Sequence, residues 1–393
     1  MLVTELILLV LAVPALAFSL YLLVLTLLSR AERAITPDTK RRLRFDVIVP
    51  AHNEQAAIET VVGNLSVLDW PQEGFRILVV ADNCTDATAA LARAAGAHVL
   101  VRHDEEKRGK GYALEYAFAE SRQQGWADAV VVVDADTQVS GNMLAAFAAR
   151  IENGAKVIQA HYGVANVHAS WRTRLMAIAL AAFHQVRSRG RERLKLSCGL
   201  RGNGWCVTHA LLREVPYRAY SLAEDIEYGI DLGMAGYRVE YADEVQVAGM
   251  MVSGEQASRS QRQRWEGGRW ELLRSRILPL LRAGVGRGGK VCLDLAMDLI
   301  VPPLSYVFLN IVIFVLLASL VAIIEHSATG WLFMGLFCMT TLMMYVLRGW
   351  QLSGVGMRGL LDLLRAPFFV LWKVLLMLRR RGPGWIRTER EPS

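Results

Sequence analysis

The chain contains 393 residues, which is enough for one large domain with attached segments, and it carries a formal net charge of +7. Hydrophobic residues make up 53% of the sequence, more than the roughly 45–50% that is usual for soluble domains. Most basic residues flank long apolar blocks and form no cluster with interleaved aromatic residues, so we expect no nucleic-acid partner. The five cysteines show no metal-type spacing, which predicts free thiols rather than a cysteine metal centre or disulfides.

The first apolar block covers residues 2–28 and contains one charged residue, Glu5. It is longer than the roughly 20 residues that cross a bilayer. A signal peptide is the competing interpretation, because Ala15-Leu16-Ala17 resembles a cleavage site. However, the block has no basic residues at its start and continues past that site. We therefore expect a transmembrane helix at 1–29 and a basic juxtamembrane linker at 30–44.

Residues 45–162 alternate between apolar strand-like runs and helical stretches. Continuous β-branched runs separated by helices indicate an α/β fold with a mostly parallel sheet covered on both faces. We assign 45–254 to this cytosolic domain and 255–290 to interfacial helices, with a long arginine-rich helical stretch at 164–196. Strands are expected at 45–49, 76–81, 98–102, 129–133 and 156–161, and helices at 55–68, 87–95 and 109–123.

Two more apolar blocks, at 299–324 and 331–347, predict two transmembrane helices within 291–347. The last apolar stretch, at 359–378, is interrupted by charged residues and a proline, which favours an interfacial helix followed by a basic tail within 348–393. Lys and Arg residues follow the first and third blocks, whereas the loop at 325–330 has none. The sequence thus predicts a multi-pass protein of the plasma (inner) membrane whose α/β domain is cytosolic.

An acidic pair, Asp134 and Asp136, directly follows the strand expected at 129–133. Side chains alternate along a strand, so both carboxylates are expected to point to one spot at its carboxyl end, where open α/β sheets bind ligands. Their hard oxygen atoms suit Mg²⁺ or Mn²⁺, which such sites usually share with substrate phosphates. The competing interpretation is an acidic turn that caps the next helix.

Polar residues also follow the strands at 45–49 and 76–81, and a lysine between two glycines, Lys110, opens the helix at 109–123. A helix amino terminus and a lysine attract an anion. Together with the acidic pair, these features predict a site for a nucleoside diphosphate. Taken singly, Asp82 is equally suited to cap a helix, and Lys110 to be a solvated surface residue.

Glu224 and Asp225 follow Ser221, and Ser221 and Glu224 have the spacing of a capping box. Asp225 would then lie in the first turn of a helix, where the dipole keeps a carboxylate ionised. An ionised carboxylate that faces a cleft can accept a proton from an attacking hydroxyl group. The alternative is that Asp225 only complements the helix dipole.

Gln261, Arg264 and Trp265 fall on one face of a predicted helix. An amide, a guanidinium and an indole on one face suit a diphosphate and a sugar, whereas the surrounding arginines also fit a membrane-surface helix. The sequence Gly202-Asn203-Gly204 predicts a turn that brings backbone close to a ligand. An ordinary turn with a packed indole is the alternative.

The ordered motifs VIVPAHNE, ADNCTDAT, GKGYAL, DAD, AED and QRQRW resemble those of membrane-bound family 2 glycosyltransferases, in particular the cellulose, hyaluronan and chitin-oligomer synthase type. The resemblance covers roughly residues 45–270. It implies a GT-A fold, a UDP-sugar donor, Mg²⁺ or Mn²⁺, and a metal-dependent hexosyltransferase that inverts the anomeric centre.

The same resemblance implies residue roles. Asp225 would be the general base, Asp136 the metal ligand, and Asp134 a ligand of the metal or the nucleotide. The donor nucleotide would contact Pro50, Ala51, Glu54, Asp82 and Lys110. The diphosphate and the acceptor would be bordered by Gln261, Arg264, Trp265, Gly202, Asn203, Gly204 and Glu224.

The expected function is the transfer of sugars from a UDP-sugar to a growing β-linked glycan. Transfer of a single sugar to a membrane lipid is the first alternative, and an inactive scaffold subunit of a polysaccharide complex is the second. Expected partners are the donor, a glycan or lipid acceptor and the bilayer. Because three spans are fewer than the larger synthases show, a homo-oligomer or an export partner would be needed to complete a channel.

Overall fold

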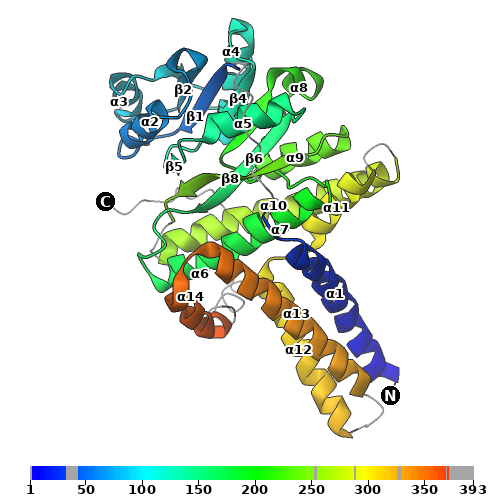
Figure 1. Cartoon of the computed structure of the whole chain (residues 1–393). Coiled ribbons are helices and arrows are strands. Elements are labelled where there is room, and N and C mark those ends of the chain that lie inside the picture. The colour runs from blue at the N-terminus through cyan, green and yellow to red at the C-terminus, as the bar shows by residue number, and fades with distance from the viewer. Residues whose placement is uncertain are drawn as a thin grey trace. The chain divides into compact units, whose positions relative to one another are not determined.

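Figure 1 shows the computed structural model of the chain, which describes residues 2–31, 43–251, 255–286, 289–324, 329–368 and 370. The chain forms two compact units. The sheet unit comprises residues 31–166, 192–296 and 388–393, and the helical unit comprises residues 1–30, 167–191 and 297–387. Most of the basic linker at 32–42 and the tail from residue 371 lie outside the described residues.

The sheet unit is built on one mixed eight-stranded sheet of order β3-β2-β1-β4-β7-β6-β8-β5. β1, β2, β3 and β4 pair in parallel, and so do β6 and β8. β7 runs antiparallel between β4 and β6, and β5 runs antiparallel to β8. The strands are β1 Phe45–Ala51, β2 Phe75–Asp82, β3 His98–Arg102, β4 Ala129–Val132, β5 Thr137–Val139, β6 Val157–Val164, β7 Trp205–Thr208 and β8 Glu240–Gly249.

Helices follow most strands of this unit, close to the predicted positions. The first half contains α2 Ile58–Ser66, α3 Thr88–Ala94, α4 Lys110–Gln124 and α5 Met143–Glu152, with a short 3-10 turn, η1, at Gln72–Gly74. The second half contains α8 His209–Glu214, α9 Glu224–Met234, α10 Glu255–Val285 and α11 Gly289–Ile300, whose last residues belong to the helical unit.

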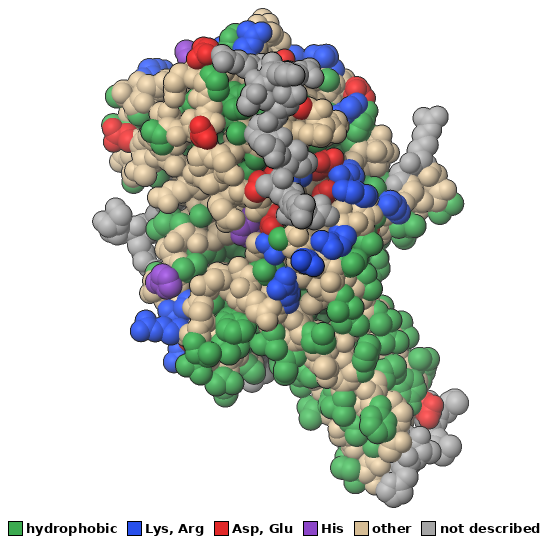
Figure 2. Space-filling model, viewed as in Figure 1, with side chains coloured by type: hydrophobic (Ala, Val, Ile, Leu, Met, Phe, Trp, Pro, Cys, Tyr) green, Lys and Arg blue, Asp and Glu red, His purple; other side chains and the backbone are tan. Residues whose placement is uncertain are grey.

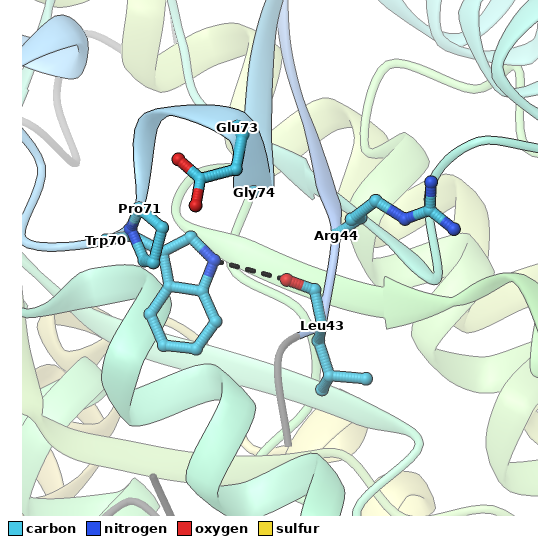
Figure 3. Close-up of a pocket in the computed structure, with 6 residues that line it drawn as sticks. All are labelled: Leu43, Arg44, Trp70, Pro71, Glu73 and Gly74. Atoms are coloured by element: carbon cyan, nitrogen blue, oxygen red, sulfur yellow. Dashed lines mark hydrogen bonds between the residues drawn. The ribbon is translucent and has the colours of Figure 1, made fainter. Parts of the chain in front are cut away.

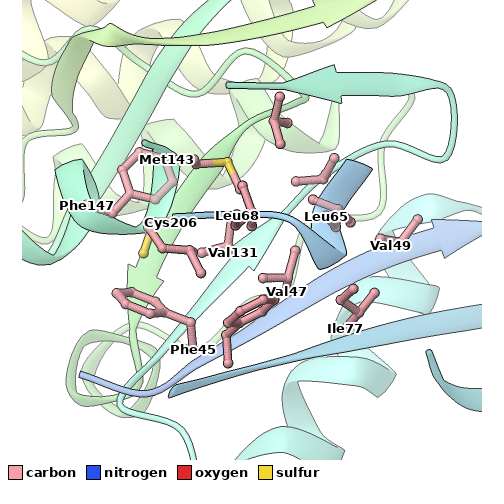
Figure 4. Packing of buried hydrophobic residues seen from close by; sticks show 14 of the residues in the cluster. Phe45, Val47, Val49, Leu65, Leu68, Ile77, Val131, Met143, Phe147 and Cys206 are labelled. Atoms are coloured by element: carbon pink, nitrogen blue, oxygen red, sulfur yellow. The ribbon is translucent and has the colours of Figure 1, made fainter. Parts of the chain in front are cut away.

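The sheet is covered on both faces, as continuous apolar strands require. Along β1, Val47 and Val49 belong to one hydrophobic cluster, and Ile48 belongs to the other. The first cluster includes Leu65 of α2 and Phe147 of α5, whose packing is visible in Figure 4. The second is formed by residues of α4, α8 and α9, among them Phe118, Leu211 and Tyr228. Because both faces are packed, polar side chains gather at the ends of the strands.

The helical unit contains three helices that are long and apolar enough to cross a membrane, at Val3–Leu27, Leu304–Ile324 and Thr329–Ser353. Apolar side chains cover much of the visible face of α1 Leu2–Leu27, α12 Leu304–Ile324 and α13 Thr329–Ser353 in Figure 2. The second span is shorter than the predicted block at 299–324, since Pro302 and Pro303 separate α11 from α12. Proline removes a backbone donor and clashes with the preceding turn.

The remaining helices of this unit include α6 Trp171–Leu180, a π-helical turn, η2, at Ala181–Val186, and the start of α7 Arg187–Arg193. They confirm that the arginine-rich stretch is largely helical. The predicted interfacial helix at 359–378 is described only in part, as α14 Gly356–Asp362 and a 3-10 turn, η4, at Leu363–Arg365.

Two buried arginines of the helical unit share one carboxylate. Asp298 Oδ1 lies 3.2 Å from Arg187 Nη1 and 2.7 Å from Arg191 Nη2. Arg187 also donates to the Tyr345 hydroxyl at 2.9 Å, and Arg191 to the Tyr21 hydroxyl at 2.5 Å. The side chains of Arg187 and Arg191 are 3% and 0% exposed, so Asp298 supplies a negative charge that water cannot replace.

We predict that Asp298→Asn lowers the free energy of unfolding by about 3–5 kcal/mol, because it removes the negative charge that Asp298 supplies to two buried guanidinium groups. The matched control is Glu5→Gln, which removes an exposed carboxylate of the same unit. The midpoint of thermal unfolding in detergent measures both. Equal midpoints for the two variants would contradict the structural role of Asp298.

Candidate active site

The acidic pair lies in a turn between β4 and β5, at the carboxyl end of the central strands. β4 ends at Val132, so the turn, and not strand alternation, sets the direction of Asp134 and Asp136. The Asp134 amide donates to the Asn203 side chain at 3.0 Å, and Asn203 donates to the Thr137 hydroxyl at 2.6 Å. Asn203 therefore supports the turn on both sides of the acidic pair.

Lys110 connects the acidic pair to the AED motif. Its Nζ lies 2.6 Å from Asp134 Oδ1 and 3.6 Å from Glu224 Oε1, and it donates to the Gly202 carbonyl at 2.6 Å. Burial lowers the pKa of the Lys110 ammonium, but Asp134 and Glu224 outweigh it, so the pKa is raised above its ordinary value. Lys110 is thus a permanent cation at the amino terminus of α4.

Glu224 and Asp225 open α9, but not through the predicted capping box. Ala223 is the N-cap residue and makes no side-chain cap. Burial raises the pKa of Glu224 to about 7, although Lys110 lowers it, and the pKa of Asp225 is also raised by burial against Lys110. The sequence suggested that the helix dipole keeps Asp225 ionised, and burial acts on its pKa in the opposite direction. Desolvation makes this pair better proton acceptors than exposed carboxylates.

The Gly202–Gly204 turn is held by a residue that the sequence did not single out. Gln159 of β6 donates to the Asn203 carbonyl at 2.7 Å and accepts from the Arg201 amide at 2.8 Å. A Cβ at Gly202, whose φ is +82°, would lie 3.5 Å from Asp225 Oδ2. The turn therefore presents bare backbone to the Asp225 carboxylate. Gln159 lies 44 positions from Asn203 in the sequence, which is why local spacing gave no sign of it.

On the far side of β1, Asp82 lies at the end of β2 and is 6% exposed. Its Oδ1 is 2.6 Å from Arg102 Nη1, and its carbonyl is 2.8 Å from His52 Nδ1. The Glu54 amide donates to the Thr88 hydroxyl at 2.8 Å. The segment from Pro50 to Glu54 is thus fastened to the segment that follows β2, and both leave the carboxyl end of the parallel strands.

A loop at 219–221 packs against α4 and leads into α9. The Tyr220 ring stacks on Tyr112 with centroids 4.4 Å apart, and a Cβ at Gly111 would lie 2.2 Å from the Ala219 carbonyl oxygen. This contact requires glycine, because any side chain at position 111 would overlap the Ala219 carbonyl oxygen. Gly111 immediately follows Lys110. The close approach sets the spacing between Lys110 and the start of α9.

α10 packs against the same region. A Cβ at Gly268 would lie 3.0 Å from Ala223 Cβ, directly before Glu224. Trp265, one turn earlier, is 39% exposed. Gln261 and Arg264 lie in the helical backbone of α10, but their side chains are outside the described residues.

The residues present fit a divalent cation that is shared with a ligand. Asp134 and Asp136 offer hard oxygen atoms, whereas no group of three or more His, Cys, Asp or Glu side chains forms a metal cluster in the described part of the chain. Mg²⁺ typically takes one or two carboxylates and completes its shell with phosphates and water. The five cysteines are free thiols.

The structure also contains a hollow of about 170 Å³ at the opposite end of the strands, where residues that precede β1 and β2 line it. Figure 3 shows its lining, in which Trp70 donates a hydrogen bond to the Leu43 carbonyl. None of the motif residues lines this hollow, so it is separate from the candidate site.

Comparison with known proteins agrees with this geometry. A sequence model described as glycosyltransferase like family 2 matches residues 42–268. A probable glycosyltransferase of Bacillus subtilis, YdaM, is 24% identical over 207 residues, 50% of this chain and 48% of that protein. Cellulose synthase 1 of Komagataeibacter xylinus is 31% identical over 111 residues, 28% of this chain and 7% of that protein. The matched segments thus span about half the length of YdaM and much less of the synthase.

Among solved structures, a mannosyltransferase of Pyrobaculum calidifontis in complex with GDP-Man and Mn²⁺ has a TM-score of 0.50 and 18% identity. The match covers 84% of this chain and 97% of that one. It shows the fold, and the sheet unit has the GT-A type α/β fold that the sequence predicts.

We predict that Gly111→Ala destabilises the protein by about 1–3 kcal/mol, because its methyl group would overlap the Ala219 carbonyl oxygen. The matched control is Gly63→Ala in α2, where nothing lies within 4 Å. There, alanine should stabilise the helix by up to about 1 kcal/mol. Thermal unfolding distinguishes the two, and a Gly111→Ala variant as stable as Gly63→Ala would contradict the close contact.

Proposed function

Because the chain belongs to glycosyltransferase like family 2, we propose that it transfers sugars from a UDP-sugar to a growing β-linked glycan at a membrane, with inversion of the anomeric centre. One observation carries the proposal. Lys110 joins the acidic turn to the AED helix, with Nζ within 2.6 Å of Asp134 and 3.6 Å of Glu224. Three separate motifs therefore meet at one charged centre.

In the proposed donor site, Asp82 accepts a hydrogen bond from the uracil, and Pro50, Ala51 and Glu54 border the nucleoside. Lys110 binds the diphosphate. This assignment is supported by its position at the amino terminus of α4, where free N–H groups and the helix dipole also favour an anion. Binding would exchange the Asp134 partner of Lys110 for a phosphate oxygen. Asp134 would then be released toward the cation.

Asp136, with Asp134, is the proposed ligand set for Mg²⁺ or Mn²⁺. A bound divalent cation would neutralise charge on the departing diphosphate. Arg264 and Gln261 would hold the same diphosphate, and Trp265 the acceptor end. Their placement on α10 is supported by the contact between Gly268 and Ala223, which brings this helix to the start of α9.

Asp225 is the proposed general base, which takes the proton of the acceptor hydroxyl as that oxygen attacks the anomeric carbon. Burial raises the pKa of Asp225, so the carboxylate is a stronger base than an exposed one. The backbone of Gly202, Asn203 and Gly204 borders the acceptor. The glycine at 202 supports this role, because a side chain there would occupy the space beside the Asp225 carboxylate.

The three apolar helices support a membrane location, with the sheet unit on the cytosolic side of the plasma (inner) membrane. Transfer of a single sugar to a lipid acceptor is the second candidate. It is favoured by the presence of only three such helices in the described residues, which is few for a channel that would export a polymer.

The test uses the full chain in detergent with Mn²⁺ or Mg²⁺ and a panel of labelled UDP-sugars and GDP-mannose. We expect transfer from a UDP-sugar that is abolished by a chelator and restored by the metal. A ladder or polymer supports glycan extension, and one glycolipid supports the second candidate. Absence of transfer and of donor hydrolysis with every sugar would refute both and favour a scaffold protein.

We predict that Asp225→Asn lowers turnover about 10²-fold or more while donor binding is largely kept, because the amide cannot accept the proton. Initial rates and equilibrium binding of the donor measure the two effects. Normal turnover in this variant would show that another group is the base.

The pH dependence of kcat/KM provides a separate prediction. The base must be deprotonated, so activity is lost as the pH falls through its pKa in the folded protein. Burial raises the pKa of both Asp225 and Glu224, the latter to about 7. The acid limb should therefore lie above the pKa of about 4 of an exposed carboxyl. The residual activity of Asp225→Asn should lack this limb, whereas an unchanged limb would exclude Asp225 as its source.

A further inference from the structure

We propose that Glu227 and Arg276 are positioning residues that lock α10, the helix with Gln261, Arg264 and Trp265, against the loop that precedes the general base. The catalytic consequence rests on the function proposed above. The contact itself is a property of the sheet unit and can be tested without it.

Glu227 uses both of its carboxylate oxygens, each on a different element. Oε2 accepts from the backbone amides of Tyr220 and Ser221 at 3.1 and 3.0 Å. Oε1 accepts from Arg276 Nη2 of α10 at 3.0 Å. A single carboxylate thus ties the loop at 219–221 to α10, while its own backbone belongs to α9, the helix whose first turn contains Asp225.

Arg276 binds α9 at two points. Its second terminal nitrogen, Nη1, lies 3.1 Å from Asp231 Oδ1, and Asp231 is one turn after Glu227 on the same face of α9. The three side chains are 14–28% exposed. A guanidinium that binds two carboxylates from a partly buried position restrains both distance and orientation.

The loop held by Glu227 is itself a structural part of the site. It contacts Gly111 through the Ala219 carbonyl and stacks Tyr220 on Tyr112. Through Glu227, α10 is therefore linked both to the Lys110 helix and to the Asp225 helix.

The ion pairs of Arg276 with Glu227 and Asp231, called the clamp below, also determine which face of α10 is turned toward the site. Arg276, Leu272, Gly268 and Trp265 recur every three or four residues, so they share one face of the helix. Leu272 is 2% exposed and Gly268 packs on Ala223. Trp265 lies on the same face one turn earlier, where its side chain is 39% exposed. The ion pairs at Arg276 thus fix the rotation that brings Trp265 to the same side as the AED motif.

The variants are Glu227→Gln and Arg276→Met in the full chain. Glutamine keeps an oxygen for the Tyr220 and Ser221 amides but offers no charge to Arg276, so it isolates the link to α10. The matched control is Lys156→Met, which removes an exposed ion pair with Glu214 in the same unit. Hydrogen–deuterium exchange of residues 255–268 reports the docking of α10, and steady-state kinetics reports kcat and the KM for the donor.

We expect both variants to increase exchange in residues 255–268 and to lower kcat about 10-fold or more, because small displacements of positioning groups cost large factors in rate. The kcat of the double variant should be no lower than that of the poorer single variant.

Lys156→Met should change neither readout. Unchanged exchange, or increased exchange with wild-type kcat, would overturn the proposal. If Arg276→Met does not fold, the exchange and kcat of Glu227→Gln alone test the proposal. If the wild-type chain transfers no sugar, the proposed function fails, and the exchange measurement still decides whether the clamp exists.

Discussion

The candidate site depends on one partly buried cation, Lys110, that lies among several carboxylates. Asp134, Glu224 and Asp225 converge on Lys110, and each raises the pKa of its ammonium. Without Lys110, these like charges would repel one another in a poorly solvated place. Gly111, the loop at 219–221 and the turn at 202–204 are arranged around the lysine. Lys110 thus connects the acidic turn, the turn at 202–204 and the start of α9.

Local sequence patterns were sufficient for the parts of this unit that depend on neighbouring residues. The strand at 98–102 was predicted with its observed bounds, and β1 and β2 differ from prediction by at most two residues at either end. Burial on both faces followed from the apolar runs at 47–49 of β1 and along β4. The patterns could not reveal that β7 enters antiparallel between β4 and β6, because strand order depends on contacts far apart in the sequence.

The site was predictable to a similar degree. Its carboxylates and Lys110 were identifiable from their positions after strands and at a helix start. The contacts that support them were not identifiable, since Asn203 lies 69 residues from Asp134, and Gln159 lies 44 residues from Asn203. The capping box failed for a local reason: Glu227, not Glu224, reaches back to the backbone amides before α9. Glu224 faces Lys110, and its carboxylate is thereby available to the site.

The geometry of α10 shows why two contact points are needed. Eleven residues separate Arg276 from Trp265, or about 16 Å along a helix axis. If Arg276 were the only anchor, a tilt of about 5° there would move Trp265 by roughly 1.4 Å. A displacement of about 1 Å can cost a factor of 10² in rate. Gly268 supplies the second point, because the absence of its side chain lets the backbone of α10 rest on Ala223 only three residues from Trp265. The ion pairs fix α10 at Arg276, and the contact with Ala223 fixes it at Gly268, which is closer to Trp265. The two contacts together define the direction of the helix axis.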